Sequence, residues 1–364
     1  MKANKLGVRG VRVRAVGAPM KRPLATASGA IKVAPLLLVD LQTDGGIVGR
    51  AYLFGITLQT LAPLAKLVEA MGAMLAGDAL APFELERKLR ARHALLGVHN
   101  IVLFAISALD MAAWDALGQA LGQPLVRLLG GAPRPVRAYN SKGLGIMPLK
   151  ALVREAVELA AEGFPALKLR LGRPGAADDL EAIRVVKKAT GGKLVLMVDF
   201  NQGLSVAEAL RRGRMIDDEG GVYWIEEPVR ADDFAGCARL ARELHTPVQI
   251  GENFMGPEQM AQALAAGACD YVMPDAQRIG GVTGWMRAAA LAQAAGLEMS
   301  SHLFPEVSCH LLAVTPTCHW LEYVDWADAV LDEPAQLSKG EVVIAERPGI
   351  GMRWNEKAVR KYAL

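Results

Sequence analysis

KLVLMVDFN, residues 193–201, is a short apolar run that ends in charged and polar residues, and the chain repeats this arrangement at regular intervals. The other runs are PALKLRLG (165–172), VYWIEEP (222–228), PVQIGEN (247–253), DYVMPDA (270–276), LEMSSHLF (297–304) and HWLEYVD (319–325). Their lengths and their β-branched and aromatic residues are typical of buried strands. Amphipathic helical patterns, such as LEAIRVVKKATG (180–191), lie between them. This alternation predicts an α/β fold with parallel strands joined by right-handed crossovers.

Successive strands of this series end in a charged residue or a histidine. These residues are Lys168, Asp199, Glu226, Glu252, Asp275 and His302, spaced 23 to 31 positions apart, or one β/α unit per step. In a TIM barrel the carboxyl ends of all strands open into one mouth, which carries the active site. A single strand can end in a polar residue merely because a loop follows, but six in register indicate a functional site. The sequence therefore predicts that these side chains converge.

The first 130 residues follow a different pattern. Residues 9–55 contain strands and turns, with Asp44, Gly45 and Gly46 as a hairpin turn. Residues 57–130 are helical in pattern, include LQTLAPLAKLVEAMGAML (58–75) and VLFAISALDMAAWDALGQALGQ (102–123), and stop at two glycines, 130 and 131. Strands followed by helices predict an α+β module in front of the barrel.

The composition excludes several classes of protein. The 364 residues suffice for a barrel of about 250 residues plus a module. Because 41 basic and 38 acidic residues are spread along the chain, we expect no nucleic-acid partner. The four cysteines lie far apart, and the basic N-terminus lacks a continuous apolar segment. We therefore expect a cytoplasmic protein with reduced thiols and no membrane span.

Asp199, Glu226 and Glu252 form the candidate metal site. Three carboxylates that converge from consecutive strands repel one another unless protons or a cation compensate. An all-oxygen ligand set suits Mg²⁺ or Mn²⁺ better than Zn²⁺. In the alternative interpretation Asp199, Glu226 and Glu227 only pair with basic residues on neighbouring strands, such as Lys168 and Arg170, and the protein has no metal dependence.

The remaining strand ends supply candidate acids and bases. Removing the weakly acidic proton next to a carboxylate requires a base and stabilisation of the resulting enediolate. Lys168 and Arg170 stand at positions i and i+2 of one strand, so both point into the barrel mouth. Asp275 and His302 end adjacent strands, which allows the carboxylate to fix the imidazole tautomer while the other ring nitrogen faces the substrate. Glu322, if protonated, donates a hydrogen bond to the enediolate; an ordinary salt bridge is an equal alternative.

An ordered set of motifs resembles the enolase superfamily, and within it the mandelate racemase subgroup, which is also similar to muconate lactonizing enzymes. The shared motifs are VDFNQ (198–202), WIEEP (224–228), GEN (251–253), MPDAQRIGGVTGW (273–285), SSHLF (300–304) and HWLE (319–322). Each motif alone is weak, but the ordered set is specific and covers essentially the whole chain. The resemblance implies a modified TIM barrel, (β/α)7β, with an N-terminal α+β capping domain. It divides the chain into 1–132 (cap), 133–324 (barrel) and a segment 325–364 that packs back on the cap.

The resemblance also implies the roles of individual residues. Mg²⁺ is expected on Asp199, Glu226 and Glu252, a His302–Asp275 dyad as base, and Glu322 as the donor to the enediolate. Asn201 is expected near the metal-bound substrate, Ser141 at the substrate carboxylate, and the loop around 20–32 over the active site. The family further implies a homo-oligomer, an octamer or a dimer.

One residue departs from the family pattern. Racemases of this type resemble two-base enzymes with a K-x-K motif on one face and the His–Asp dyad on the other, and here Arg170 replaces the second lysine. A guanidinium stays protonated at physiological pH and is a poor base. Arg170 is therefore an unusual base assisted by Lys168 and the metal, a ligand for a carboxylate or hydroxyl, or a deliberate replacement of a lysine.

Leu24, Ile31 and Ile56 match positions that line the substrate pocket in the resembling racemase. An apolar pocket favours an aryl or alkyl 2-hydroxy acid over a sugar acid. Lys21, Arg22 and Lys32 flank the same loop, either as surface charges or as partners for a distal carboxylate. The sequence thus favours an isomerase that racemises a mandelate-like 2-hydroxy acid. The alternatives are an acid-sugar dehydratase (a lyase) that uses His302 alone, and a non-catalytic barrel kept for assembly.

Overall fold

The computed structural model describes residues 6–364, and the chain begins with an antiparallel sheet of three strands. The strands are β1 (Val8–Thr26), β2 (Gly29–Thr43) and β3 (Val48–Phe54), in the order β1-β2-β3. The predicted turn at 44–46 joins β2 to β3, closed by a hydrogen bond from Thr43 N to Ile47 O of 3.0 Å. Four helices follow: α1 (Leu58–Leu75), α2 (Pro82–Arg92), α3 (Asn100–Leu121) and α4 (Leu125–Leu128). The predicted α+β module is confirmed: α3 ends at Leu121 and is capped by Gly122, and α4 ends at Leu128, before the glycines 130 and 131.

Helix α3 forms the core of this module. An 18-residue window of this 22-residue helix has a mean hydropathy of 1.6, which satisfies the length and composition of a membrane span, but 89% of that window is buried inside the protein. A Cβ added at Gly49 of β3 would lie 1.9 Å from Ala112 O of α3, so only glycine permits this approach of sheet and helix. Burial on all sides explains the continuous apolar sequence of α3.

A closed barrel of parallel strands follows, as the sequence predicts. Its strands are β4 (Val136–Asn140), β5 (Ala166–Arg170), β6 (Val195–Asp199), β7 (Ile225–Glu226), β8 (Val248–Ile250), β9 (Tyr271–Val272), β10 (Met299–Ser301) and β11 (Cys318–Tyr323). Pairing of β11 with β4 closes the ring. Tyr139, Met197, Trp224 and Trp320 fill the interior, so the barrel is a packed core below the site. Strand β4 is missing from the runs used for the prediction because its five residues include no charged strand end.

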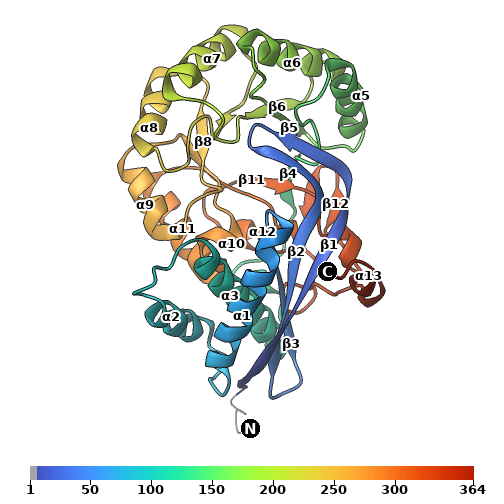
Figure 1. Ribbon diagram of the computed structural model, residues 1–364, viewed down its shortest axis with the longest axis vertical. Helices are drawn as coiled ribbons and strands as arrows, with labels where there is room; N and C mark the ends of the chain where they lie inside the picture. The colour runs from blue at the N-terminus through green and yellow to red at the C-terminus, as the bar shows by residue number, and fades with distance from the viewer. Residues whose placement is uncertain (1–5) are drawn as a thin grey trace.

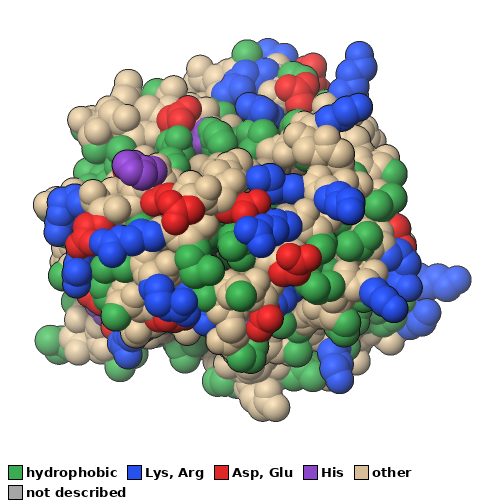
Figure 2. All heavy atoms as spheres, turned by 90° about the horizontal axis from the view of Figure 1, so that it is seen from above, with side chains coloured by type: hydrophobic (Ala, Val, Ile, Leu, Met, Phe, Trp, Pro, Cys, Tyr) green, Lys and Arg blue, Asp and Glu red, His purple; other side chains and the backbone are tan. Residues whose placement is uncertain are grey.

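Helices surround the barrel in a ring (Figure 1). They are α5 (Leu149–Ala160), α6 (Ala176–Ala189), α7 (Val206–Glu219), α8 (Phe234–Glu243), α9 (Pro257–Ala265), α10 (Ala276–Ile279), α11 (Gly281–Ala295) and α12 (Pro305–Ala313). Helix α5 shows why they pack this way: its buried residues Leu152, Ala156 and Leu159 recur at helical spacing and form one apolar face. On the face seen from above, Lys and Arg side chains lie among Asp and Glu side chains (Figure 2), in agreement with the even spread of charge in the sequence.

The β1–β2 hairpin is long enough to reach from the capping module over the barrel (Figure 1). Its tip is attached to the barrel, because Ser28 Oγ donates a hydrogen bond to Asn201 O (2.6 Å) and Ile146 N donates one to Ala25 O (2.7 Å). Arg22 lies near three glutamates of α5 and the loop after it, at 3.4 Å from Glu155, 3.2 Å from Glu158 and 3.7 Å from Glu162.

Lys21 lies 3.1 Å from Asp325 and 3.5 Å from Asp328. Arg22 therefore ties the hairpin to the barrel, and Lys21 ties it to the C-terminal segment. The side chain of Lys21 is 66% exposed, in agreement with the predicted surface charge, whereas that of Arg22 is 25% exposed and pairs with glutamates of the barrel.

The C-terminal segment contacts both parts of the chain. It contains η1 (Asp328–Val330), β12 (Gln336–Ser338), β13 (Glu341–Val343) and α13 (Glu356–Lys361). Strand β13 pairs antiparallel with β4 of the barrel, an addition that the sequence did not predict. Farther on, Ala363 forms a bridge with Val16 of β1, and Ile350 N donates to Asp115 Oδ1 of α3 (2.6 Å). The domain limits at 132 and 324 remain predictions.

Candidate active site

The strand register brings the three predicted metal-binding carboxylates together. Asp199 ends β6 and is paired with Glu226, which ends β7. Glu252 follows β8 after Gly251, whose φ of 139° suits glycine and where a Cβ would lie 2.8 Å from Met273 N. One carboxylate oxygen from each acid lies within 4.8 Å of the others.

This cluster fits a hard divalent cation. All its donors are carboxylate oxygens, the ligands that Mg²⁺ and Mn²⁺ prefer, and Asp199 and Glu226 are buried. Burial, together with the nearby Asp199, Glu322 and Glu252, raises the pKa of Glu226 well above its ordinary value, despite the opposing effect of Lys168. A bound cation would relieve this repulsion. Asn201 offers a further donor, because its Oδ1 is buried and has no hydrogen-bond partner among residues 6–364.

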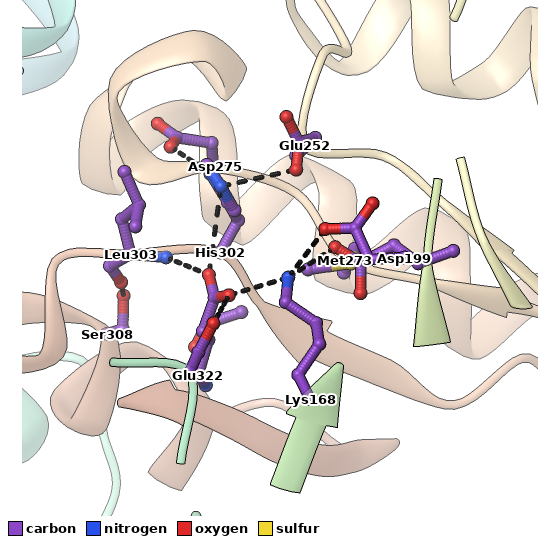
Figure 3. Close-up of polar contacts among 12 residues, drawn as sticks. Lys168, Asp199, Glu252, Met273, Asp275, His302, Leu303, Ser308 and Glu322 are labelled. Carbon is purple, nitrogen blue, oxygen red and sulfur yellow. Dashed lines mark hydrogen bonds and ion pairs between the residues drawn. The ribbon is translucent and has the colours of Figure 1, made fainter. Parts of the chain in front are cut away.

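Lys168 is the cation that lies against this cluster (Figure 3). Its Nζ is 2.6 Å from Glu226 Oε1, 2.7 Å from Glu322 Oε1 and 3.3 Å from Asp199 Oδ2. Burial alone would lower the pKa of Lys168, but Glu226, Glu322 and Asp199 outweigh burial and raise that pKa well above its usual value. Lys168 is therefore an ammonium. A single positive charge does not neutralise the three carboxylates that it contacts.

His302 and Asp275 form a closely bonded pair (Figure 3). Asp275 Oδ2 lies 2.6 Å from His302 Nδ1, and a β-bridge joins the two residues where their strands end. The other ring nitrogen, Nε2, lies 3.3 Å from Glu252 Oε2 and 3.7 Å from Glu322 Oε2. Burial lowers the pKa of His302, yet Glu252, Glu322 and Asp275 together raise it above the ordinary value. Nδ1 is thus occupied, and Nε2 is the nitrogen on the side of the cavity.

Glu322, on β11, lies between the two halves of the site. Its Oε1 accepts a hydrogen bond of 2.6 Å from Ser141 Oγ and lies near Lys168, and its Oε2 accepts one of 2.9 Å from Leu303 N. Burial raises the pKa of Glu322, but Lys168, His302 and Arg170 outweigh it and lower that pKa below its ordinary value. In this arrangement the carboxylate only accepts hydrogen bonds, whereas its predicted donor role requires a proton.

Arg170 points into the mouth but is bound to the loop after β4. Its Nη2 donates to Ser141 Oγ (2.7 Å), and its Nη1 donates to Ser141 O (3.0 Å) and Gly143 O (2.7 Å). Ser141 is fully buried behind Arg170 and Glu322 and does not line the cavity, although we predicted it at the substrate carboxylate.

A cavity with a volume of about 270 Å³ lies between the hairpin and the barrel mouth. Its polar wall includes Lys168, Arg170, Asp199, Asn201, Glu252, His302 and Glu322. The three predicted apolar residues, Leu24, Ile31 and Ile56, line it as well, together with Phe54 and Trp326. Phe54 ends β3 and Trp326 begins the C-terminal segment, so three distant parts of the chain build the apolar wall.

A second polar group lies beside Glu252, and the sequence predicted for its glutamate only an ion pair with a basic residue. Glu227, the second glutamate of WIEEP, accepts hydrogen bonds from Asn253 Nδ2 at 2.8 and 2.9 Å, and Arg278 donates to Asn253 Oδ1. Burial and the nearby Glu252 raise the pKa of Glu227 well above its ordinary value. The paired glutamates and the asparagine directly after Glu252 were the available signal. Their mutual contact depends on neighbouring loops and could not be read from spacing.

Comparison with known proteins agrees with this geometry. The model of the mandelate racemase/muconate lactonizing enzyme N-terminal domain matches residues 8–130, and the enolase C-terminal domain-like model matches residues 151–358. An enolase from the alphaproteobacterium BAL199, solved with bound Mg, is 47% identical with a TM-score of 0.96 and covers 99% of this chain and 100% of its own. An enolase from Bradyrhizobium, solved with magnesium and mandelic acid, is 45% identical with a TM-score of 0.95 and covers 100% and 99%.

Characterised relatives differ in the reaction they catalyse. L-talarate/galactarate dehydratase from Salmonella typhimurium is 35% identical over 269 residues, which are 73% of this chain and 67% of the relative. Other relatives are cycloisomerases and epimerases. The chemistry thus varies while the two matched domains are shared, and we conclude that this chain belongs to the mandelate racemase/muconate lactonizing enzyme family of the enolase superfamily.

Proposed function

We propose that this protein is a Mg²⁺-dependent enzyme in which His302 removes the α-proton of a carboxylate substrate, most simply a mandelate-like 2-hydroxy acid. One observation carries the proposal. Asp275 occupies Nδ1 of His302 at 2.6 Å, and Nε2 of the same ring lies on the wall of a cavity that also holds Asp199 and Glu252. A base and an acidic cation site on one cavity are what α-proton removal requires.

Asp199, Glu226 and Glu252 would hold the cation. When bound, Mg²⁺ would withdraw negative charge from the substrate carboxylate and so make the neighbouring proton more acidic. The structures of two similar proteins, from BAL199 and Bradyrhizobium, contain magnesium and support this choice of metal.

The other residues bind and orient the substrate. Lys168, an ammonium on the cavity wall, would attract the substrate carboxylate, and Asn201 would contact the same end of the molecule. A substrate carboxylate beside Glu322 would raise the pKa of Glu322, because like charges disfavour ionisation. Glu322 would then carry the proton that its donor role needs.

The apolar wall supports a substrate with an aryl or alkyl group. Leu24, Ile31, Ile56, Phe54 and Trp326 form an apolar side of the cavity, where the hydroxyls of a sugar acid would be costly to bury unpaired. Mandelic acid, present in the similar Bradyrhizobium protein, carries one phenyl ring that suits such a wall.

Racemisation of such a substrate would need a second base on the face opposite His302, because mandelate has no β-hydroxyl to eliminate and inversion requires a proton to be delivered to the other face. A second candidate, dehydration of an acid sugar, is favoured by Arg170. If His302 is the sole base, its imidazolium could return the abstracted proton to a departing β-hydroxyl. The relation to L-talarate/galactarate dehydratase supports this candidate.

A panel of acids in D₂O with Mg²⁺ tests the proposal. We would follow α-H/D exchange by NMR, inversion by chiral chromatography and 2-keto acid formation for both mandelate enantiomers and for aldonic and aldaric acids. Inversion without a keto acid identifies the racemase, and a keto acid identifies the dehydratase. Exchange with no acid of the panel, or exchange that persists in His302→Asn, would reject the proposed function.

A further inference from the structure

The direction of the hydrogen bonds around Ser141 is fixed by chemistry. A guanidinium only donates, so Ser141 Oγ uses a lone pair to accept from Arg170 Nη2 at 2.7 Å. The hydroxyl then has its single proton left for Glu322 Oε1, at 2.6 Å. Arg170 therefore donates to Ser141, and Ser141 in turn donates to Glu322.

Two further bonds lock Arg170 in place. Its Nη1 donates to the carbonyl oxygens of Ser141 and Gly143, which ties the guanidinium to the backbone of the loop after β4. Arg170 is 3% exposed, so these bonds are shielded from water. A planar fork with several donors holds such a loop in a way that a single ammonium cannot.

We infer that Arg170 is a positioning residue, which orients Ser141 and through it Glu322, and that α-protons are removed only from the His302 side of the cavity. The inference rests on the proposed removal of the α-proton by His302, and it excludes racemisation by the wild-type protein. It assigns to Arg170 neither the role of a base nor that of a simple carboxylate ligand.

The strand order explains the one-sided chemistry. Arg170 on β5, Ser141 after β4, Glu322 on β11 and His302 after β10 occupy neighbouring positions around the barrel. Arg170 and His302 therefore stand at opposite ends of one arc, on either side of Ser141 and Glu322. At the Arg170 end, a permanently protonated guanidinium faces the cavity and has no lone pair to accept a proton.

Two of the five N–H groups of Arg170 make no hydrogen bond to residues 6–364, one on Nη2 and one on Nε. Its Nε is buried and has no hydrogen-bond partner within the described chain, although Arg170 lines the cavity. These groups stand at the end of the arc away from His302, where they can donate hydrogen bonds but cannot accept a proton.

A double-mutant cycle tests the inference in the full-length protein with Mg²⁺. We would measure kcat and KM for α-H/D exchange of (R)- and (S)-mandelate, or of the panel acid that exchanges, in Arg170→Met, Ser141→Ala and the double variant. If Arg170 acts through Ser141, each single change lowers kcat roughly 10- to 100-fold, as expected for loss of a charge-assisted hydrogen bond. The double variant is then no slower than the slower single variant. Arg211→Met removes an exposed arginine that pairs with Glu208, and leaves the rate unchanged.

The wild-type protein is expected to exchange only one enantiomer, the one whose α-proton faces His302. Exchange of both enantiomers would overturn the inference. So would a double variant whose loss in kcat equals the product of the losses in the two single variants. If Arg170→Met does not fold, the exchange of the two enantiomers by the wild-type protein is the measurement that decides on the inference. Failure of the proposed function gives a different pattern, namely no exchange of any acid or exchange that survives His302→Asn, and it overturns both.

Discussion

Asp275 Oδ2 lies 2.6 Å from His302 Nδ1, and the β-bridge between the two residues holds their backbones in the same register. The imidazole can therefore present only Nε2 to the cavity. The carboxylate both selects this tautomer and stabilises the imidazolium that forms when a proton is taken.

Asp275→Asn should lower the exchange rate strongly and change KM little. An amide in place of the carboxylate stabilises the imidazolium less and can favour the wrong tautomer, so we expect a loss of roughly 10²- to 10⁴-fold in kcat. Steady-state exchange measured by NMR checks this expectation. Asp232→Asn, at an exposed aspartate paired with Arg230, serves as the control. A kcat close to that of the wild type would show that Asp275 does not support the base.

Asp199→Asn should remove the stabilisation of the protein by Mg²⁺. Thermal unfolding of the wild type is expected to shift upward with Mg²⁺ concentration, because the ion binds only the folded state. In the variant the shift should be small, since one of the three clustered carboxylates is lost. Its Tm without metal should not fall, because the change relieves repulsion among buried carboxylates. An equal Mg²⁺-dependent shift in both proteins would place the ion elsewhere.

Arg170→Lys should add a second base to the cavity. A lysine amine can release its proton and lie across from His302, whereas a guanidinium cannot. We expect the variant to exchange the mandelate enantiomer that the wild type leaves untouched, and to produce slow inversion measurable by chiral chromatography. Continued one-sided exchange would mean that position 170 does not reach the α-carbon.

Leu24→Ala should weaken binding of an aryl substrate. Leu24 is buried and lines the cavity from the hairpin, and its side chain exceeds that of alanine by three carbons. At about 0.8 kcal/mol per buried methylene, KM for mandelate should rise by roughly 10- to 50-fold, with a smaller effect on kcat. Leu95→Ala, at a fully exposed leucine, is the matched control. An unchanged KM would argue for a substrate without an apolar group at this wall.

Asp110→Asn should change how stability depends on pH. Burial raises the pKa of Asp110 in α3 to about 7, although hydrogen bonds from Thr283 oppose the shift. An unfolded aspartate has a pKa of about 3.9, so the folded state binds more protons between about pH 4 and pH 7. Asp110 therefore makes the free energy of unfolding fall as pH rises through this window, by up to about 1.4 kcal/mol per pH unit.

Urea unfolding at several pH values would measure the difference between the two proteins. The variant should lose this part of the slope while its amide keeps the contact with Thr283. Asp218→Asn, at an exposed position, controls for the change of net charge. Parallel stability curves for wild type and Asp110→Asn would show that Asp110 is ionised throughout.

The sequence alone predicted the alternation of strands and helices and the residues that end the strands. Both are local properties: apolar runs of strand length, helical periodicity, and the side-chain alternation that points Lys168 and Arg170 to one face. Once a parallel barrel is inferred, convergence of Asp199, Glu226 and Glu252 follows from its geometry, because all strands end at the same mouth.

Other features of the structure could not be predicted from local sequence patterns. The pairing of Lys21 with Asp325 of the C-terminal segment and of Arg22 with Glu155 of the barrel depends on where the long hairpin lies. Phe54 and Trp326 are ordinary apolar residues that become cavity walls only when distant segments meet.

The role of Arg170 could be predicted only in part from the sequence, because its hydrogen-bond partners depend on the tertiary structure. The sequence established that a residue of this position points into the mouth and that a guanidinium is a poor base. Only closure of the barrel, which places the loop after β4 beside β5, provides Ser141 and Gly143 as acceptors for that guanidinium. Hydrogen bonds act over about 3 Å, so residues nearly 30 positions apart can be matched only after the whole ring of strands has closed.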